Sequence, residues 1–169
     1  MRAQTLLRRE RDDDTDAIRS VVEAAFGRPT EADLIEALRR ERAVIAAFVA
    51  VVDQRIVGHV LFSRVLIDAG GDAHAAAALA PLAVHPDRQR QGVGTRLVRF
   101  GLDALTTRGE HAVLVLGDPR YYARFGFSTQ LARGLETSFP PDAFMALELV
   151  GGALTSVHGR VAYPSAFGV

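Results

Sequence analysis

The chain has 169 residues, 49% of them apolar, and its 20 acidic side chains balance 20 basic ones. This length and apolar fraction suit one globular domain, so we expect residues 1–169 to form a single domain. The chain contains neither cysteine nor lysine, which excludes disulfides, thiolate metal sites, cysteine nucleophiles, Schiff-base enzymes and the lysine-bearing phosphate loop of nucleotide triphosphatases. Its zero net charge supplies no field that would draw it to nucleic acid or to an anionic membrane surface.

The sequence shows no targeting segment and no metal motif. Residues 1–14 lack the apolar core of a signal peptide, and no apolar run approaches the ~20 residues that a spanning helix needs. A cytoplasmic location is therefore expected. The five histidines form no pair at HxxxH spacing, so no metal site is expected.

The first third of the chain predicts a strand, two helices and a hairpin. Residues 3–9 form the expected strand. The second helix is expected to begin at Thr30, which forms a variant of the capping box with Asp33. Residues 43–53 and 55–68 are two runs rich in β-branched residues, joined near residues 53–55. The first run is apolar at odd and even positions alike, so both faces of this strand should be covered. The first helix is predicted by apolar residues at helical spacing: Ile18, Val21, Val22, Ala25 and Phe26.

The remaining elements alternate in type. Residues 73–84 are rich in alanine, which favours a helix, but the neighbouring glycines and prolines favour a strand, and we predict a strand. A helix should follow from Val93 and end near Gly109. The later predictions are a buried strand over 111–117, a short helix over 119–125, a strand over 143–150 and an irregular tail over 164–169.

The loop HPDRQRQGVGTRL, residues 85–97, lies between the alanine-rich strand and the helix after it. Gly92 and Gly94 free the backbone of Cβ atoms at a helix start, where N–H groups lack intrahelical partners and the helix dipole is positive. Such a turn can bind a phosphate. The alternative is a tight turn without a ligand. Arg88, Arg90 and Arg96 add positive charge to the loop, or they form an ordinary solvated face.

The segment LAVHPDRQRQGVGTRLV resembles the acetyl-CoA-binding motif of the GCN5-related N-acetyltransferases, the GNAT family. In that motif a Gln or Arg precedes x-x-Gly-x-Gly/Ala, which corresponds here to Gln89, Gly92 and Gly94. The later segment YYARFGF resembles the second signature of the family, a tyrosine five residues before the Phe of a Gly-Phe pair, here Tyr122 and Phe127. The phrases APLAV and LGDPRYYARFGF are similar to the YhbS-type acetyltransferases within the family, and this resemblance covers nearly the whole chain.

The resemblance implies an α/β (α+β) fold with acetyl-CoA as cosubstrate. The mixed central sheet would have about six to seven strands flanked by about four helices, and would open between its fourth and fifth strands to hold acetyl-CoA. Residues 82–84 would pair with the pantetheine arm and residues 90–95 would hold the pyrophosphate. Arg88 and Arg124 either meet the 3′-phosphate or are ordinary solvated surface charges. Arg90 departs from the family, where many members have glycine. The implied cofactor-binding residues are Leu82, Ala83, Val84, Gln89, Arg90, Gln91, Gly92, Val93, Gly94, Thr95 and Arg124.

The resemblance also implies an N-acetyltransferase that works by direct attack in a ternary complex, since no cysteine can carry an acyl group. Tyr122 would protonate the departing thiolate, and a packed aromatic is the alternative role for its ring. The acceptor, a primary amine, is open among small molecules, peptide N-termini, lysine side chains and aminoacylated RNA, with the neutral charge disfavouring RNA. The alternative function is a non-catalytic module that binds acyl-CoA.

Three residues are candidates for a general base, and the sequence assigns none of them. His59 either reaches the substrate or is hydrogen-bonded in place on its strand. His85 more naturally caps or positions the loop. Asp118 either orders the turn before residues 119–122 or faces the amine.

Overall fold

The computed structural model describes residues 4–169, which its contacts divide into two compact units. The first unit contains the chain up to Phe62 together with Pro81–Asp103, and the second contains Ser63–Ala80 and Ala104–Val169. The chain passes between the units within strand β3 (Arg55–Ala69), strand β4 (Asp72–Val84) and helix α3 (Val93–Thr107).

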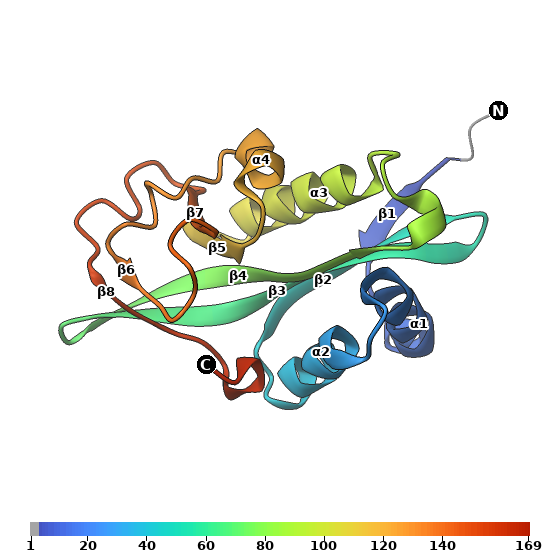
Figure 1. Cartoon of the computed structure of the whole chain (residues 1–169), viewed down its shortest axis with the longest axis horizontal. Coiled ribbons are helices and arrows are strands. Elements are labelled where there is room, and N and C mark those ends of the chain that lie inside the picture. Colours follow the sequence, from blue (N-terminus) through green and yellow to red (C-terminus); the bar gives the residue numbers. More distant parts are fainter. Residues whose placement is uncertain (1–3) are drawn as a thin grey trace. The chain divides into compact units, whose positions relative to one another are not determined.

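The first unit contains a set of neighbouring strands with helices on both faces. Strand β1 (Leu6–Arg9) runs antiparallel to β2 (Val44–Val52), and β3 and β4 follow in hydrogen-bonded order. Ala3, at the start of the strand predicted over 3–9, lies outside the described residues. Helices α1 (Thr15–Phe26) and α2 (Thr30–Arg40) cover one face of these strands and α3 covers the other (Figure 1). Strand β2 is buried along most of its length, as its apolar residues at both parities predict.

The hairpin and the alanine-rich strand are confirmed. Asp53 and Gln54, between β2 and β3, have φ values of 48° and 63°, and positive φ at both central residues matches the right-handed twist of a two-residue hairpin. In β4, Ala76 and Ala77 are fully buried. The burial of these small side chains in the sheet therefore outweighs the preference of alanine for a helix.

The predicted capping box of α2 is wrong. The helix begins at Thr30, but the capping residue is Pro29, and among the described residues no side-chain cap bond forms at this end. The Asp33 carboxylate instead accepts a hydrogen bond from Arg19 of α1 at 2.7 Å. An ion pair between helices has thus taken the carboxylate that the capping box requires.

The second unit contains both parallel and antiparallel strand pairs. Strand β4 pairs in parallel with β5 (Ala112–Leu116) at Ala77–Val113 and Ala78–Leu114. Along its whole length β5 pairs antiparallel with β7 (Phe144–Glu148). Parallel and antiparallel pairs thus occur in one sheet, which is mixed, as predicted.

Two short strands of the second unit escape prediction. Strand β8 (Gly159–Ala162) pairs antiparallel with β3, and β6 (Leu135–Glu136) pairs in parallel with β8. They bring the strands in residues 4–169 to eight, where six to seven were expected. A Cβ atom on Gly159 would lie 2.0 Å from the carbonyl oxygen of Asp68, so β8 can approach β3 only because this residue has no side chain. Two to four residues are too short to show a strand period.

The second unit also contains short helical turns. Helix α4 (Pro119–Tyr122) continues into the 3₁₀ turn η3 (Ala123–Phe125), which together match the helix predicted over 119–125. The tail, predicted to be irregular, contains a 3₁₀ turn, η4 (Ser165–Phe167). No helix in residues 4–169 combines the length and apolarity needed to cross a membrane.

Candidate functional site

The loop between β4 and α3 lies in the first unit and is held by its own residues. The His85 N–H donates to the Val57 carbonyl at 2.8 Å, which ties the end of β4 to β3. The His85 Nδ1 atom accepts from the Asp87 N–H at 3.3 Å and so caps the 3₁₀ turn η2 (Pro86–Arg88). His85 therefore positions the loop, as the sequence indicates.

Both glutamines of the loop also bond within it. The Gln89 side-chain amide donates to the Val84 carbonyl at 3.0 Å, and that of Gln91 donates to the Asp87 carbonyl at 3.1 Å. These bonds return the loop onto the end of β4. The two side chains thus set the shape of the loop, and its backbone is left to meet a ligand.

The backbone before α3 is arranged as an anion site requires. Arg90 and Gly92 are left-handed, with φ values of 59° and 82°. Within residues 4–169, the N–H groups of Arg90, Gln91 and Gly92 donate to no backbone carbonyl, and Arg96 N–H makes the first helical bond, to Gly92 at 3.0 Å. Left-handed residues in such a turn direct neighbouring N–H groups into a concavity that binds anions. A Cβ atom on Gly92 would meet no heavy atom of the described residues within 4 Å, so they leave the space beside it open.

Arg90 occupies a conformation that glycine adopts more easily. We expect Arg90→Gly to raise the free energy of unfolding by up to about 1 kcal/mol, because a left-handed residue with a Cβ atom is strained. Urea unfolding measures this change. Arg88→Gly is the control, since Arg88 is not left-handed and should gain nothing. Equal or lower stability of Arg90→Gly would show that arginine is unstrained here.

The remaining predicted residues of the first unit contribute mainly backbone. Ala83 and Val93 are buried, and Leu82 and Val84 are half-buried. A Cβ atom built on Gly58 of β3 would lie 3.2 Å from the Val93 side chain, which shows how closely α3 packs on this strand. Gly94 and Thr95 belong to the first turn of α3. Side chains packed in this way leave the N–H groups as the parts that can meet a ligand.

In the second unit, Asp118 orders the turn that carries Tyr122. The Asp118 carboxylate accepts from the Arg120 N–H at 2.9 Å and pairs with the Arg120 guanidinium at 3.2 Å. These contacts to Arg120 hold the pKa of Asp118 below its usual value. Of the two roles considered for Asp118, the structure therefore supports the capping of α4.

The Tyr122 side chain lies among aromatic rings. Its ring makes edge contacts with Tyr121 and Phe127 at centroid distances of 5.0 Å and 5.8 Å. Burial raises the pKa of Tyr122 to about 12, with a smaller contribution from Tyr121. The phenol is therefore protonated at neutral pH and can donate a hydrogen bond. Arg124 lies over the Tyr121 ring at 4.4 Å and donates to the Tyr121 carbonyl at 2.8 Å.

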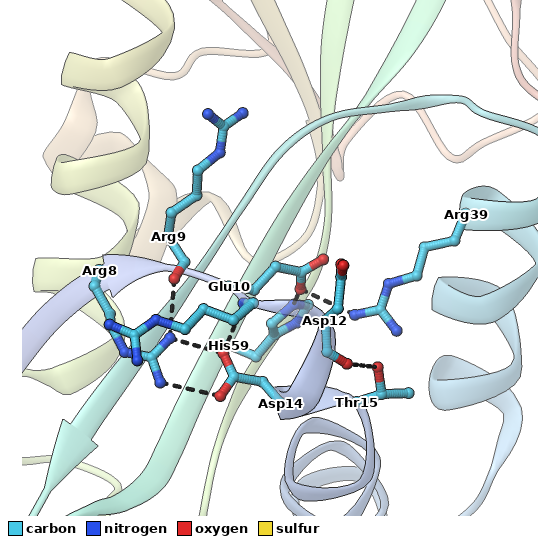
Figure 2. Close-up of polar contacts among 9 residues, drawn as sticks. Arg8, Arg9, Glu10, Asp12, Asp14, Thr15, Arg39 and His59 are labelled. Carbon is cyan, nitrogen blue, oxygen red and sulfur yellow. Dashed lines mark hydrogen bonds and ion pairs between the residues drawn. The ribbon is translucent and has the colours of Figure 1, made fainter.

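A polar cluster that the sequence does not reveal surrounds His59 in the first unit. Figure 2 shows one oxygen of the Glu10 carboxylate joined to both His59 and Arg39. The distances are 2.8 Å to His59 Nε2 and 2.9 Å to Arg39 Nη2. Since a carboxylate only accepts, this hydrogen bond requires a proton on His59 Nε2. His59 is fully buried, and its Nδ1 has no partner among the described residues. Of the two roles considered for His59, hydrogen bonding in place is confirmed.

Glu10 stands in the charged run RRERDDD, where nothing distinguishes it from its neighbours. Burial raises its pKa, but the hydrogen bonds and charges of His59 and Arg39 outweigh this effect and leave the pKa below the usual value. Nearby, Asp14 accepts from Arg8 at 2.7 and 3.0 Å and from the Arg11 N–H at 2.7 Å, which also lowers its pKa. The folded first unit therefore favours the ionised form of both carboxyl groups, Glu10 and Asp14.

Acid should destabilise the protein through these carboxyl groups. A group with a lowered folded-state pKa stabilises the fold above its unfolded pKa, about 4, and loses this contribution as the pH falls through the folded pKa. We expect a melting temperature that is level above about pH 5 and falls below about pH 4. Glu10→Gln should lower the free energy of unfolding by ~1–3 kcal/mol at pH 7, and the difference should narrow in acid.

Thermal unfolding across the pH range measures both effects. Asp72→Asn is the control, because Asp72 is an exposed carboxylate and should change neither stability nor its pH dependence. A Glu10→Gln protein that is as stable as the wild type at pH 7 would contradict the assigned role of the cluster.

The structure thus groups the predicted residues within each unit. The loop and the end of β4 lie in the first unit, and Asp118, Tyr122 and Arg124 lie in the second. Among residues 4–169, no group of three or more His, Asp or Glu side chains could hold a metal ion.

Comparison with known proteins extends the similarity over the whole chain. Residues 7–130 match a family model described as an acetyltransferase (GNAT) domain. YhbS, an uncharacterized N-acetyltransferase of Escherichia coli K12, is 35% identical over 165 residues, which make up 96% of this chain and 98% of YhbS. The crystal structure of E. coli YhbS in complex with CoA has a TM-score of 0.91 at 34% identity, covering 100% of this chain and 94% of that one.

A second solved structure agrees. A GNAT family acetyltransferase from Brucella melitensis, in complex with acetyl-CoA, has a TM-score of 0.82 at 35% identity. The match covers 98% of this chain and 99% of that one. The similarity therefore extends well beyond the loop and the tyrosine segment, and it includes the predicted mixed α/β fold.

Proposed function

Because the chain belongs to the GNAT acetyltransferase family, as its sequence predicts, we propose that it transfers an acetyl group from acetyl-CoA to a primary amine. The observation that carries this proposal is the loop before α3, in which Arg90 and Gly92 are left-handed and neighbouring N–H groups lack carbonyl partners. A diphosphate is the anion that such a concavity suits. The relatives crystallised with CoA and acetyl-CoA support the same ligand.

In this proposal the first unit binds the cosubstrate mainly through its backbone. The N–H groups of residues 90–95 hold the pyrophosphate, and Arg124 of the second unit contributes charge to the 3′-phosphate. Residues 82–84 of β4 pair with the pantetheine arm, and one of their N–H groups donates to the thioester carbonyl. Pro81 has no N–H and cannot be this donor.

Attack by the amine is direct, since the chain has no cysteine to carry the acetyl group. Tyr122 donates to the thiolate as it departs. Its pKa of about 12 keeps the phenol protonated but makes it a weaker acid than a free thiol, whose pKa is about 8.5. The hydrogen bond therefore stabilises the charge that develops on sulfur. A thiolate shielded from water is more basic, so the pKa of its thiol lies closer to that of Tyr122 when the proton is finally transferred.

The environment of Tyr122 favours an enzyme over a module that only binds acyl-CoA. A phenol enclosed by three aromatic rings and held protonated is organised for donation. A binding module has no use for such a donor. Turnover of acetyl-CoA with a panel of primary amines separates the two functions, because only an enzyme releases CoA faster when an amine is present.

Binding of the cosubstrate is tested by melting. We expect CoA and acetyl-CoA to stabilise the fold, by ~2.7 kcal/mol at about 100 times the dissociation constant, because a ligand that binds only the native state shifts unfolding by mass action. ATP and NAD are the controls and should give no comparable shift. No shift with saturating CoA would overturn the proposal.

A further inference from the structure

Gly117 lies where strand β5 meets the turn that carries Tyr122. It directly follows Leu116, the last residue of β5, and precedes Asp118, which caps α4. Its N–H donates to the Ala143 carbonyl at 3.0 Å. Gly117 is not among the residues with positive φ, so its φ angle does not require glycine. The reason for glycine here must lie in the surroundings.

Those surroundings are the Tyr122 ring. A Cβ atom on Gly117 would lie 2.4 Å from Tyr122 Cε2, 2.9 Å from Cδ2 and 3.5 Å from Cζ. All three nearest atoms belong to this ring. Gly134 and Gly159 differ, because the added Cβ atom would meet backbone atoms of Val157 and Asp68, so those glycines allow close approach of chain segments.

The ring cannot easily move away from an added methyl group. Tyr121 contacts it edge-on at 5.0 Å, Phe127 does so at 5.8 Å, and Phe125 lies at 6.2 Å. Phe127 is itself buried. With neighbours on its other sides, the ring can yield to a methyl group chiefly by moving outward, toward solvent.

We propose that Gly117 is a positioning residue, whose missing side chain forms the slot in which the Tyr122 ring is seated and its hydroxyl aimed. This slot, called the seat of the Tyr122 ring below, is inferred only from the geometry around Gly117. Its effect on catalysis rests on the proposed function, in which Tyr122 donates to the thiolate. A misplacement of about 1 Å in a reacting group can lower a rate by about 100-fold.

Gly117→Ala tests the seat without any assay of activity. Tetranitromethane nitrates accessible tyrosines, and mass spectrometry locates the product among the three tyrosines of the chain. We expect nitration of Tyr122 to be several-fold faster in Gly117→Ala than in the wild type. Tyr163, whose pKa burial also raises, should stay protected in both proteins and so report an intact second unit. Gly151→Ala is the matched control, since its Cβ atom would meet no heavy atom within 4 Å and its φ is not positive.

A double-mutant cycle covers the case in which Gly117→Ala unfolds too easily for labelling. If the clash involves only the Tyr122 ring, Gly117→Ala lowers the melting temperature of the wild type and leaves that of Tyr122→Ala unchanged. Equal losses in both backgrounds would overturn the seat, as would unchanged nitration of Tyr122.

The rate measurement separates the seat from the proposed function. If the seat exists and Tyr122 is the donor, Gly117→Ala lowers kcat by at least about 10-fold and changes the KM for acetyl-CoA little. In a Tyr122→Phe background, the same substitution should lower kcat little further. Faster nitration with an unchanged kcat supports the seat and contradicts the role of Tyr122 as a donor. A lower kcat with unchanged nitration overturns the seat, because the loss then arises elsewhere.

Discussion

Gly92→Glu should abolish CoA binding and leave the protein folded. The φ of Gly92 is 82°, and any L-residue there is strained by ~1–2 kcal/mol, which a stable domain survives. The larger effect is electrostatic, because the new carboxylate would occupy the open space where we place the pyrophosphate, beside N–H groups that donate to no backbone carbonyl of residues 4–169. Isothermal titration with CoA measures the loss, and circular dichroism checks the fold.

Gly27→Glu is the matched control for this change. Gly27 ends helix α1 in the same unit with a φ of 69°, and a Cβ atom there would also meet no heavy atom within 4 Å. The control therefore reproduces the strain and the added charge away from the loop, and it should keep its CoA affinity. If Gly92→Glu bound CoA as tightly as the control, the phosphate site would have to lie elsewhere.

Tyr122→Phe should lower kcat by ~100- to 10,000-fold, the usual size of general-acid assistance. The ring and its aromatic contacts are kept, so the fold and the affinity for CoA should not change. The KM for acetyl-CoA should change little, because the lost hydrogen bond strengthens only as charge develops on sulfur. The loss should also shrink with an acyl donor whose thiol leaves more easily.

Tyr163→Phe provides the same substitution at another half-buried tyrosine of the second unit, and it should leave kcat unchanged. An unchanged rate in Tyr122→Phe, with the chemical step shown to limit turnover, would mean that water or another group supplies the proton. Tyr122 would then be a packing residue, which is the alternative that its aromatic neighbours also allow.

Much of this molecule is encoded in short stretches of sequence. The strand, loop and helix from Asp72 to Thr107 follow from turn residues, apolar spacing and two glycines, all of which act on their own backbone or on the next turn. The hairpin between β2 and β3 and the cap formed by His85 are equally local. Such features can be predicted because the interacting atoms are only a few residues apart.

The structure adds what depends on partners far away in the sequence. The bond between Glu10 and His59 joins residues 49 positions apart, and one acid in a charged run gives no sign of it. Strands β6 and β8 are defined by the strands they pair with, because their few residues carry no period of their own. The capping box of α2 failed for the same reason, since Arg19 of another helix binds the acid that the local pattern assigned to the cap.

Gly117 and Arg90 show the same division within the candidate site. The sequence marks Arg90 as a departure from a family motif, but only the backbone, with a φ of 59°, explains why glycine is common there. The sequence gives no reason for Gly117, which has an ordinary backbone and a ring where its side chain would be. Local sequence thus determines the loop and its helix, since each residue there acts on its neighbours. Only the tertiary structure determines how Tyr122 and His59 are held, because the groups that hold them converge through packing.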